Sequence, residues 1–235
     1  MFAPAPAEAV VYNARTCDPL KKDIASPAFF AGHPSLIATE SSYRSNEEIY
    51  GEGEPAEYIY QVLSGAVRTY KLLSDGRRQI GAFHLPGDVF GVETRASYRV
   101  TAEAITDASV RLVKRSAVER VAQSDATIAC ALWAAASGEL RHAEDHMMLL
   151  GRKTAIERVA TFLLEMDRRL ASTQGRSLPM CRRDIGDYLG LTLETVSRAI
   201  SAFQAKGVVE LCGARCIAVR KRDRLAAIAE IECDA

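Results

Sequence analysis

The chain has 235 residues, 48% of them hydrophobic and 26% charged, which suits ordinary soluble domains and is long enough for two. Its 30 basic side chains balance 30 acidic ones, so the net charge by itself predicts no nucleic-acid partner. No apolar run approaches the ~18 residues of a membrane span, and the N-terminus lacks the pattern of a signal peptide. We therefore expect a cytoplasmic protein that contacts no membrane and keeps its six scattered cysteines reduced.

The first part of the chain predicts an arm followed by an all-β domain. Residues 1–25, with prolines among several alanines, are expected to be a flexible arm. From Leu36 to Val121, short apolar runs alternate with turn signals such as Ser74-Asp75-Gly76-Arg77 and Leu85-Pro86-Gly87-Asp88. This spacing predicts a β-barrel or β-roll, which we assign to residues 26–122.

A long helix is expected over residues 123–151, with Ser124 as its N-cap and Asp125 placed favourably near the positive end of the helix dipole. Apolar and small residues recur along it at steps of three and four, which forms a narrow seam. The seam consists of Ala129, Leu132, Ala136, Leu140, Ala143, Met147 and Leu150. We favour a second copy of the chain as its partner and a homodimer as the result; the alternative is packing of the helix on its own β domain.

The C-terminal part, residues 152–235, has a different charge and a helical pattern. From residue 151 onward the chain carries 15 Lys and Arg against 11 Asp and Glu, which leaves 15 against 19 before it and fits a basic binding module. A helix is expected from Lys153 to Ser172. Its apolar face comprises Ile156, Val159, Ala160, Leu163, Leu164 and Leu170. Residues 208–219 then predict two strands joined by a three-residue turn, a small wing.

Between that helix and the wing lie two short amphipathic helices. Cys181 stands where an N-cap belongs, and Asp184 follows three residues later as in a capping box. Gly190 permits a left-handed turn between the helices. Ile185, Tyr188 and Leu189 are expected to bury the first helix, and Val196, Ile200 and Phe203 the second. The pattern predicts a winged helix-turn-helix that binds double-stranded DNA.

Four side chains remain on the outer face where the second helix begins: Leu193, Glu194, Ser197 and Arg198. Arg198 can donate to guanine O6 and N7, and Glu194 can accept from cytosine N4 and also hold the Arg198 guanidinium one turn away. We expect these residues to read bases. The expected contacts to the DNA backbone are Arg182, Arg183, Thr192 and Thr195.

Residues 181–207, CRRDIGDYLGLTLETVSRAISAFQAKG, resemble the helix-turn-helix of the CRP/FNR transcription regulators. Glu194-x-x-Ser197-Arg198 is similar to the reading pattern of the FNR and FixK branch. Motifs similar to that family's β-roll stand upstream: Gly51-x-Gly53, Val62-x-Ser64-Gly65-x-Val67, Asp75-Gly76-Arg77 and Pro86-Gly87-Asp88-x-Phe90-Gly91. The resemblance implies an α+β protein with an N-terminal β-roll, a long dimerisation helix and a C-terminal winged helix-turn-helix. It further implies a homodimer on a palindrome with TTGAT-like half-sites and recruitment of RNA polymerase.

Two effectors of that family are tested against the residues. The cyclic-nucleotide members carry an adjacent arginine and serine that hold the phosphate, but here that pair falls on Tyr98-Arg99 in a segment that is too short. Iron–sulfur members need four thiolates, and the N-terminal arm offers Cys17 alone. We therefore expect no cofactor; a regulator that responds to a cyclic nucleotide or another small ligand stays as the alternative.

Cys181 is the candidate redox residue. The helix dipole and the neighbouring Arg182 and Arg183 favour a thiolate, and oxidation beside DNA phosphate would add bulk and negative charge and so weaken binding. The alternative is that Cys181 merely replaces a serine or threonine cap.

The remaining histidines and cysteines predict no functional site. His142 and His146 lie one turn apart but are interpreted as exposed residues without metal, and Cys212 and Cys216 as packing residues of the wing. An enzyme of the metal-dependent β-roll kind needs several ligands, whereas residues 36–121 contain only His84. We therefore expect no enzyme.

Overall fold

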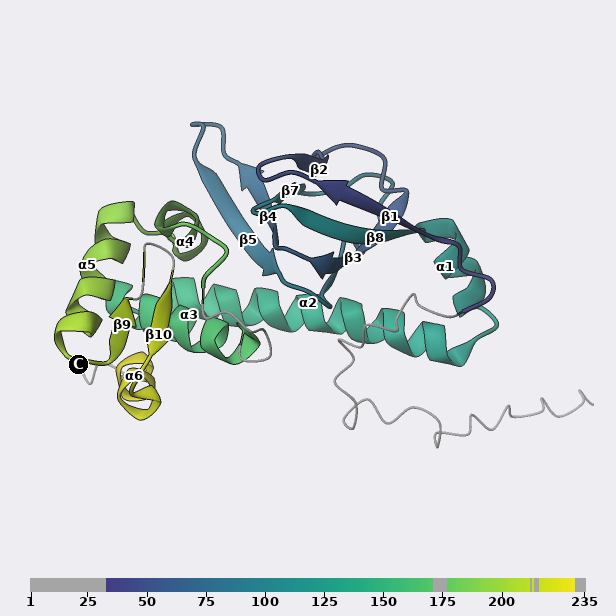
Figure 1. The fold of residues 1–235 in the computed structure, drawn as a ribbon. Coiled ribbons are helices and arrows are strands. Elements are labelled where there is room, and N and C mark those ends of the chain that lie inside the picture. The colour runs from purple at the N-terminus through teal and green to yellow at the C-terminus, as the bar shows by residue number, and fades with distance from the viewer. Residues whose placement is uncertain (1–32, 171–176, 212, 214–215, 231–235) are drawn as a thin grey trace, which may run out of the picture.

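The computed structural model describes residues 33–170, 177–211, 213 and 216–230, and Figure 1 shows how its elements are arranged. The predicted arm of residues 1–25, Cys17 and Cys212 lie outside the described residues. Within the described part, no helix is long and apolar enough to cross a membrane.

The predicted β-roll is present as two antiparallel sheets of four strands each. The first has the order β1 (Ala38–Tyr43), β8 (Ala108–Lys114), β3 (Tyr58–Ser64) and β6 (Val89–Phe90). The second has the order β2 (Glu48–Tyr50), β7 (Thr101–Ala104), β4 (Val67–Leu72) and β5 (Arg78–His84). Figure 1 shows the roll lying along the long helix α2.

Aromatic rings fill the interior of the roll. Tyr50 and Tyr98 stack with their ring centroids 3.7 Å apart, and Tyr60 and Phe90 stack at 5.2 Å. The Tyr98 hydroxyl also donates a 2.8 Å hydrogen bond to the Tyr58 carbonyl oxygen. Tyr98, which stands where a cyclic-nucleotide cassette would carry its arginine, is therefore a core residue of this roll.

His84 is also a core residue. Its Nε2 lies 3.1 Å from the Thr69 hydroxyl, and the ring stacks on Phe90. Burial lowers the pKa of His84 to about 3, so the ring is neutral at physiological pH.

The segment after the roll differs from the sequence prediction in two ways. Residues assigned to strands form the helix α1 (Arg115–Ala122). The long helix α2 (Ala126–Arg152) then begins three residues after the expected bound of 123, because Asp125 and not Ser124 is its N-cap. The Asp125 carboxylate accepts from the backbone N–H of Thr127 at 2.7 Å, whereas the Ser124 hydroxyl donates to the Val121 carbonyl oxygen. An ionised carboxylate is the stronger acceptor for these free N–H groups.

The two sides of α2 have different neighbours. Ile128 and Leu132 pack against an apolar cluster of the roll and α1. On the other side Trp133, Leu140 and Met147 are 76%, 61% and 65% exposed, at a spacing of seven residues. The roll therefore covers the side of the helix that carries Leu132, and the exposed stripe runs through Trp133 where the sequence pattern placed Leu132. Of the other predicted seam residues, Ala136 and Ala143 are exposed, and Ala129 and Leu150 are half-buried.

The C-terminal part consists of α3 (Ala155–Leu170), α4 (Arg182–Leu189), α5 (Leu193–Ala205), the wing strands β9 (Val209–Leu211) and β10 (Ile217–Val219), and α6 (Arg222–Ala229). Val159, Ala160 and Leu163 bury the predicted face of α3, but Ile156 is 49% exposed. The wing pairs antiparallel as expected. Helix α6, which the sequence analysis did not predict, packs against α3.

One carboxyl group at the contact of α2 with the roll titrates near neutral pH. Burial, and then the nearby Glu93 charge, raise the pKa of Glu139 to about 7, although Arg99 partly offsets this. Glu93 itself is paired with Arg99 at 2.9 Å. The folded protein therefore prefers a protonated Glu139, and the stability that this provides at low pH is lost as the pH rises through about 7.

We predict that Glu139→Gln has little effect on unfolding at pH 5 and stabilises the protein at pH 8. Because the group is partly exposed and each pKa unit is worth about 1.4 kcal/mol, a gain on the order of 1–2 kcal/mol is expected. Urea unfolding at both pH values measures it, with Glu144→Gln on an exposed part of α2 as control. Equal gains at pH 5 and pH 8 would contradict the titration.

Candidate nucleic-acid interface

Helices α4 and α5 form the predicted helix-turn-helix. Gly190 ends α4 with a φ of 63°, in the left-handed region that favours glycine, and the Leu191 N–H donates to the Gly186 carbonyl oxygen at 2.9 Å. The six predicted apolar positions are all buried: Ile185, Tyr188, Leu189, Val196, Ile200 and Phe203. This packing fixes α5 relative to α4 and leaves the first turn of α5 at the surface, at the end of the molecule furthest from α1 (Figure 1).

Thr192 begins α5. Its hydroxyl oxygen accepts from the Thr195 N–H at 3.2 Å, and the two hydroxyls lie 3.1 Å apart. Thr192 is exposed and Thr195 half-buried. Thr192 is therefore the N-cap of α5, and its contacts with the N–H and hydroxyl of Thr195 orient both hydroxyls.

The four expected base-reading residues share one face. Glu194 and Arg198 are exposed, Leu193 is 39% exposed, and Ser197 is half-buried. In the described part of the chain Glu194 and Arg198 form no ion pair with each other, so the predicted contact between them is absent. Arg182 Nη1 instead donates to the Ser197 hydroxyl at 3.3 Å, which links the start of α4 to the reading face.

Glu194 is ionised at neutral pH. A backbone N–H at the helix start lowers the pKa of Glu194, and the Thr192 hydroxyl and the charges of Arg198 and Arg183 lower it further. An ionised carboxylate can only accept hydrogen bonds, which matches the donor that cytosine presents in the major groove.

Cys181 caps α4, and Asp184 completes the predicted capping box. The Cys181 backbone N–H and the thiol both donate to Asp184 Oδ2, each at 3.1 Å. The sequence shows only the positive charges of Arg182 and Arg183 beside this sulfur. The thiol hydrogen bond places the sulfur against a carboxylate as well as beside the two arginines.

Asp184 also has partners that sequence reasoning missed. Its Oδ1 accepts from Arg68 Nη1 at 3.0 Å and from Arg78 Nη2 at 2.6 Å, and both arginines belong to the roll. Local patterning carries no signal for this contact, since Arg68 and Asp184 are 116 residues apart.

The two histidines of α2 are not exposed, contrary to the prediction. His142 Nε2 lies 3.1 Å from the Gly81 carbonyl oxygen, and His146 Nε2 lies 2.8 Å from that of Tyr188. The His146 ring also stacks on Tyr188 at 4.2 Å. These contacts place the two histidines of α2 against β5 and α4. Among the described residues, no group of three or more potential ligands could hold a metal ion. Cys216 is half-buried next to Ser177.

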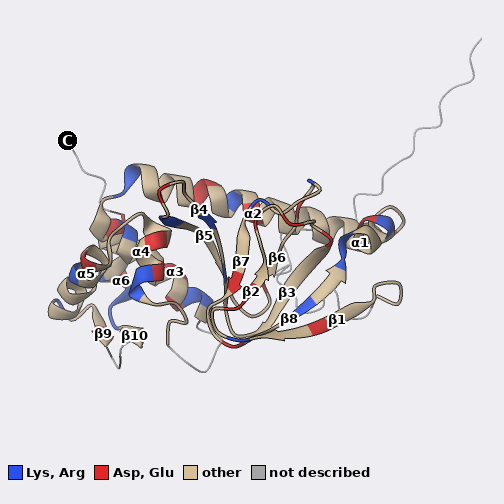
Figure 2. Ribbon diagram, turned by 90° about the horizontal axis from the view of Figure 1, so that it is seen from above, with Lys and Arg blue, Asp and Glu red and all other residues tan. Residues whose placement is uncertain are grey.

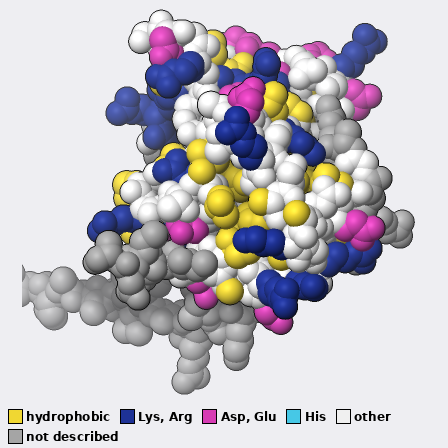
Figure 3. Space-filling model, turned by 90° about the vertical axis from the view of Figure 1, so that its left-hand side faces the viewer, with side chains coloured by type: hydrophobic (Ala, Val, Ile, Leu, Met, Phe, Trp, Pro, Cys, Tyr) yellow, Lys and Arg dark blue, Asp and Glu magenta, His cyan; other side chains and the backbone are white. Residues whose placement is uncertain are grey.

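Figure 3 shows the end of the molecule that carries α5, where Lys and Arg side chains lie around a centre of apolar and neutral ones, with acidic side chains among them. This face has the exposed cations that a DNA backbone requires.

Residues 157–228 match the family model described as the Crp-like helix-turn-helix domain, and residues 40–125 match the cyclic nucleotide-binding domain. The nitrogen fixation regulation protein FixK of Azorhizobium caulinodans is 46% identical over 196 residues, which cover 81% of this chain and 79% of that protein. The chain belongs to the CRP/FNR family. FixK of Rhizobium meliloti is 40% identical over 199 residues, covering 85% and 89% of the two chains. The solved structure of FixK2 from Bradyrhizobium japonicum is 69% identical, with a TM-score of 0.80 over 82% of this chain and 98% of that one.

As a CRP/FNR protein, the chain is a transcription regulator with a helix-turn-helix DNA-binding domain and not an enzyme. The family and the α+β fold with a β-roll, a long helix and a C-terminal helix-turn-helix confirm the resemblance noted in the sequence.

We predict that Gly186→Ala destabilises the DNA-binding domain. A Cβ at residue 186 would lie 2.6 Å from the Leu191 carbonyl oxygen, which is backbone and cannot rotate away. Forcing the turn open should cost about 1–3 kcal/mol in thermal or urea unfolding. Gly151→Ala on α2, where a Cβ meets nothing within 4 Å, is the matched control and should unfold like the wild type or later. Equal stability of the two variants would show that the turn tolerates a side chain.

Proposed function

We propose that this protein is a homodimeric activator that binds a palindrome with TTGAT-like half-sites. One observation carries the proposal: α5 presents Glu194 and Arg198 exposed on the first turns of an ordered helix-turn-helix, in the E-x-x-S-R pattern. Residues 152–235 would be the DNA-binding domain, 123–151 the dimerisation segment, 26–122 the roll and 1–25 the arm.

The exposed side of α2 supports the homodimer. Trp133, Leu140 and Met147 form a stripe with a seven-residue period, and Ala136 and Ala143 lie between them. A seven-residue repeat of large and small apolar residues fits a second helix of the same kind in close contact. Such a dimer presents two α5 helices, which a palindrome requires.

The proposed reading of bases assigns separate tasks to the side chains. Arg198 donates to a guanine edge, ionised Glu194 accepts from cytosine, and Leu193 meets a thymine methyl group. Ser197, linked to Arg182, contacts a base or a phosphate. The expected backbone contacts come from Arg182, Arg183, Thr192 and Thr195, which lie at the N-termini of α4 and α5.

We further propose that DNA binding needs neither a cyclic nucleotide nor an iron–sulfur cluster. The stacked rings of Tyr50, Tyr60, Phe90 and Tyr98 occupy the interior of the roll, which supports this proposal.

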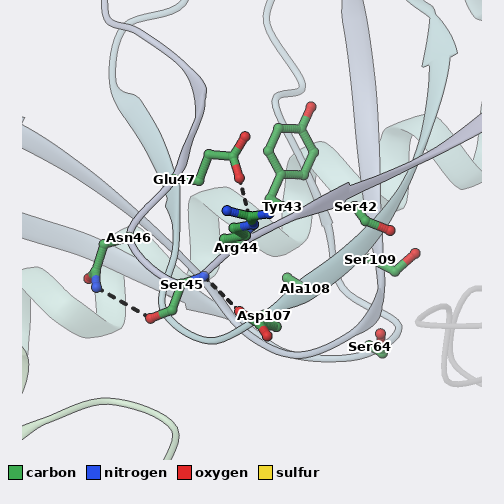
Figure 4. Close-up of a pocket in the computed structure, with 10 residues that line it drawn as sticks. All are labelled: Ser42, Tyr43, Arg44, Ser45, Asn46, Glu47, Ser64, Asp107, Ala108 and Ser109. Atoms are coloured by element: carbon green, nitrogen blue, oxygen red, sulfur yellow. Dashed lines mark hydrogen bonds between the residues drawn. The ribbon is translucent and has the colours of Figure 1, made fainter.

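A response to another small ligand is the second candidate, and one observation favours it. A groove of about 940 Å³ lies where β1 and β8 meet, lined by hydroxyls that include Ser42, Ser64 and Ser109 (Figure 4). Its rim is held by internal bonds such as Ser45 N–H to Asp107 at 2.9 Å. Tight DNA binding by ligand-free protein would argue against this candidate.

The names of relatives guide the proposed biological role. FixK proteins are named for nitrogen fixation regulation, and AadR of Rhodopseudomonas palustris, 38% identical, is named a transcriptional activatory protein. We propose activation in the cytoplasm, through recruitment of RNA polymerase, of genes for oxygen-limited metabolism or nitrogen fixation.

Arg198→Ala tests base reading. We expect it to weaken binding to the TTGAT-N4-ATCAA duplex by about 1–3 kcal/mol per half-site, because one bidentate guanine contact is lost, and to relax preference at that base pair only. Fluorescence anisotropy titrations on the palindrome and on single-substituted duplexes measure both effects. Arg224→Ala on the exposed start of α6 removes the same charge elsewhere and should keep the base preference. A uniform loss across all duplexes would assign Arg198 to the backbone instead.

Peroxide treatment tests Cys181 as a redox residue. The thiol first loses its proton, the thiolate attacks one oxygen of hydrogen peroxide, the O–O bond breaks, and the departing hydroxide takes up that proton and leaves as water, which gives a sulfenic acid. This adds bulk next to Asp184 and, after further oxidation, negative charge facing the DNA. We expect treated wild type to bind the palindrome at least about threefold more weakly, whereas Cys181→Ser keeps its affinity. If both proteins lose affinity equally, another group is oxidised and Cys181 is only a cap.

A further inference from the structure

We infer that a buried group of ion pairs between the roll and α4 is a positioning device that sets the orientation of α5 and thereby the half-site spacing that the dimer accepts. This group, here called the joint, consists of Arg68, Arg78, Asp184 and Asp187. The inference rests on the proposed palindrome-binding dimer.

The joint connects β4 and β5 to the helix that precedes the reading helix. Arg68 of β4 reaches Asp184 at 3.0 Å and also pairs with Glu103 of β7. Arg78 of β5 donates to Asp184 at 2.6 Å and to Asp187 at 3.0 and 2.8 Å through Nε and Nη2. Figure 2 shows basic residues of β4 and β5 next to the acidic ones of α4. The roll arginines thus hold two carboxylates one turn apart on α4.

Because the ion pairs of the joint are buried, they hold α4 in one orientation. The side chains of Arg68 and Asp184 are only 7% and 4% exposed, so neither can exchange its partner for water without leaving a buried charge unpaired. Apolar contacts at the same boundary, such as Phe83 with Phe162 and Tyr188, hold the parts together but tolerate sliding. The ion pairs with their fixed geometry therefore select one orientation of α4.

Two further contacts hold α4 from neighbouring elements. Gln79 Nε2 of β5 donates to the Tyr188 carbonyl oxygen at 3.2 Å, and His146 of α2 lies against the same carbonyl. The C-terminal end of α4 is thus fixed to both the roll and the dimerisation helix. Because α5 follows after only a short turn, its direction relative to the dimer axis follows that of α4.

The joint affects DNA recognition through the distance between the two half-sites that the dimer can bind. Two half-sites are read together only if the two α5 helices match the separation of successive major grooves. Adding one base pair to the spacer changes both the distance and the rotation between half-sites. A rigid joint therefore makes binding depend strongly on spacer length, and a loosened joint should weaken this dependence.

The test uses the full-length protein with Arg78→Gln or Asp187→Asn, both at the partly exposed rim of the joint, where side chains are 20% and 26% exposed. Arg77→Gln is the matched control, since it removes a neighbouring charge whose ion-pair partner among the described residues is Asp75 of the same hairpin. Anisotropy titrations use TTGAT-N4-ATCAA and the same half-sites with N3 and N5 spacers. Calorimetric unfolding of the DNA-free proteins is measured in parallel.

We expect the joint variants to bind the N4 duplex about three- to thirtyfold more weakly, and to lose part of the preference for N4 over N3 and N5, while Arg77→Gln behaves like the wild type. The double variant should be hardly worse than Arg78→Gln alone, because that substitution already removes the contact with Asp187 together with the bond to Asp184. If the joint variants lose affinity but keep the wild-type spacer preference, the joint only stabilises the protein and does not orient α5. If their affinity is unchanged, the inference is wrong.

Calorimetry separates this inference from the proposed function. We expect a single unfolding transition for the wild type and separate transitions of the roll and the DNA-binding domain for the joint variants. If no protein bound the palindrome but the transitions still separated, the half-site would be wrong and the coupling role of the joint would stand. If unfolding were also unchanged, the joint itself would be refuted.

Discussion

The carboxylate of Asp184 accepts hydrogen bonds from two parts of the molecule at once. One oxygen binds Arg68 and Arg78 of the roll, and the other binds the backbone N–H and thiol of Cys181. The same residue therefore completes the capping box at the start of the helix-turn-helix and connects this motif to the roll. Because the group is buried, its charge is stabilised only while these donors stay in place. Apolar packing holds α5 on α4, and we infer that this anion sets how the pair is oriented relative to the roll.

The long helix α2 contributes the second constraint. One side is covered by the roll through Ile128 and Leu132, and His142 and His146 face β5 and α4, whereas Trp133, Leu140 and Met147 remain exposed. The histidines are bound by backbone carbonyl oxygens, so this part of α2 is a docking face for the chain's own domains. The exposed stripe is the part of α2 that the proposed homodimer would bury.

The roll is built around stacked aromatic rings. In a family whose matching domain model is described as cyclic nucleotide-binding, this chain places Tyr98 in the core, stacked on Tyr50 and bonded to the Tyr58 carbonyl oxygen. A roll stabilised by its own side chains gives the DNA-binding domain a fixed support. That is consistent with the proposed binding without ligand and with a joint that holds a single orientation.

Sequence alone determined the parts whose signals are local. Gly190 between two apolar patterns predicts the helix-turn-helix, and alternating strands with glycine turns predict the roll, because backbone conformation and the period of buried residues are set by near neighbours. Even so, Asp125 and not Ser124 caps α2, and the sequence does not predict α1 and α6, since helices of eight residues complete only about two turns. The exposed positions of Glu194 and Arg198 also followed from the helical period. Only the tertiary structure decided which charges meet, because the pairing of Arg68 with Asp184 joins residues 116 positions apart and depends on how two domains pack.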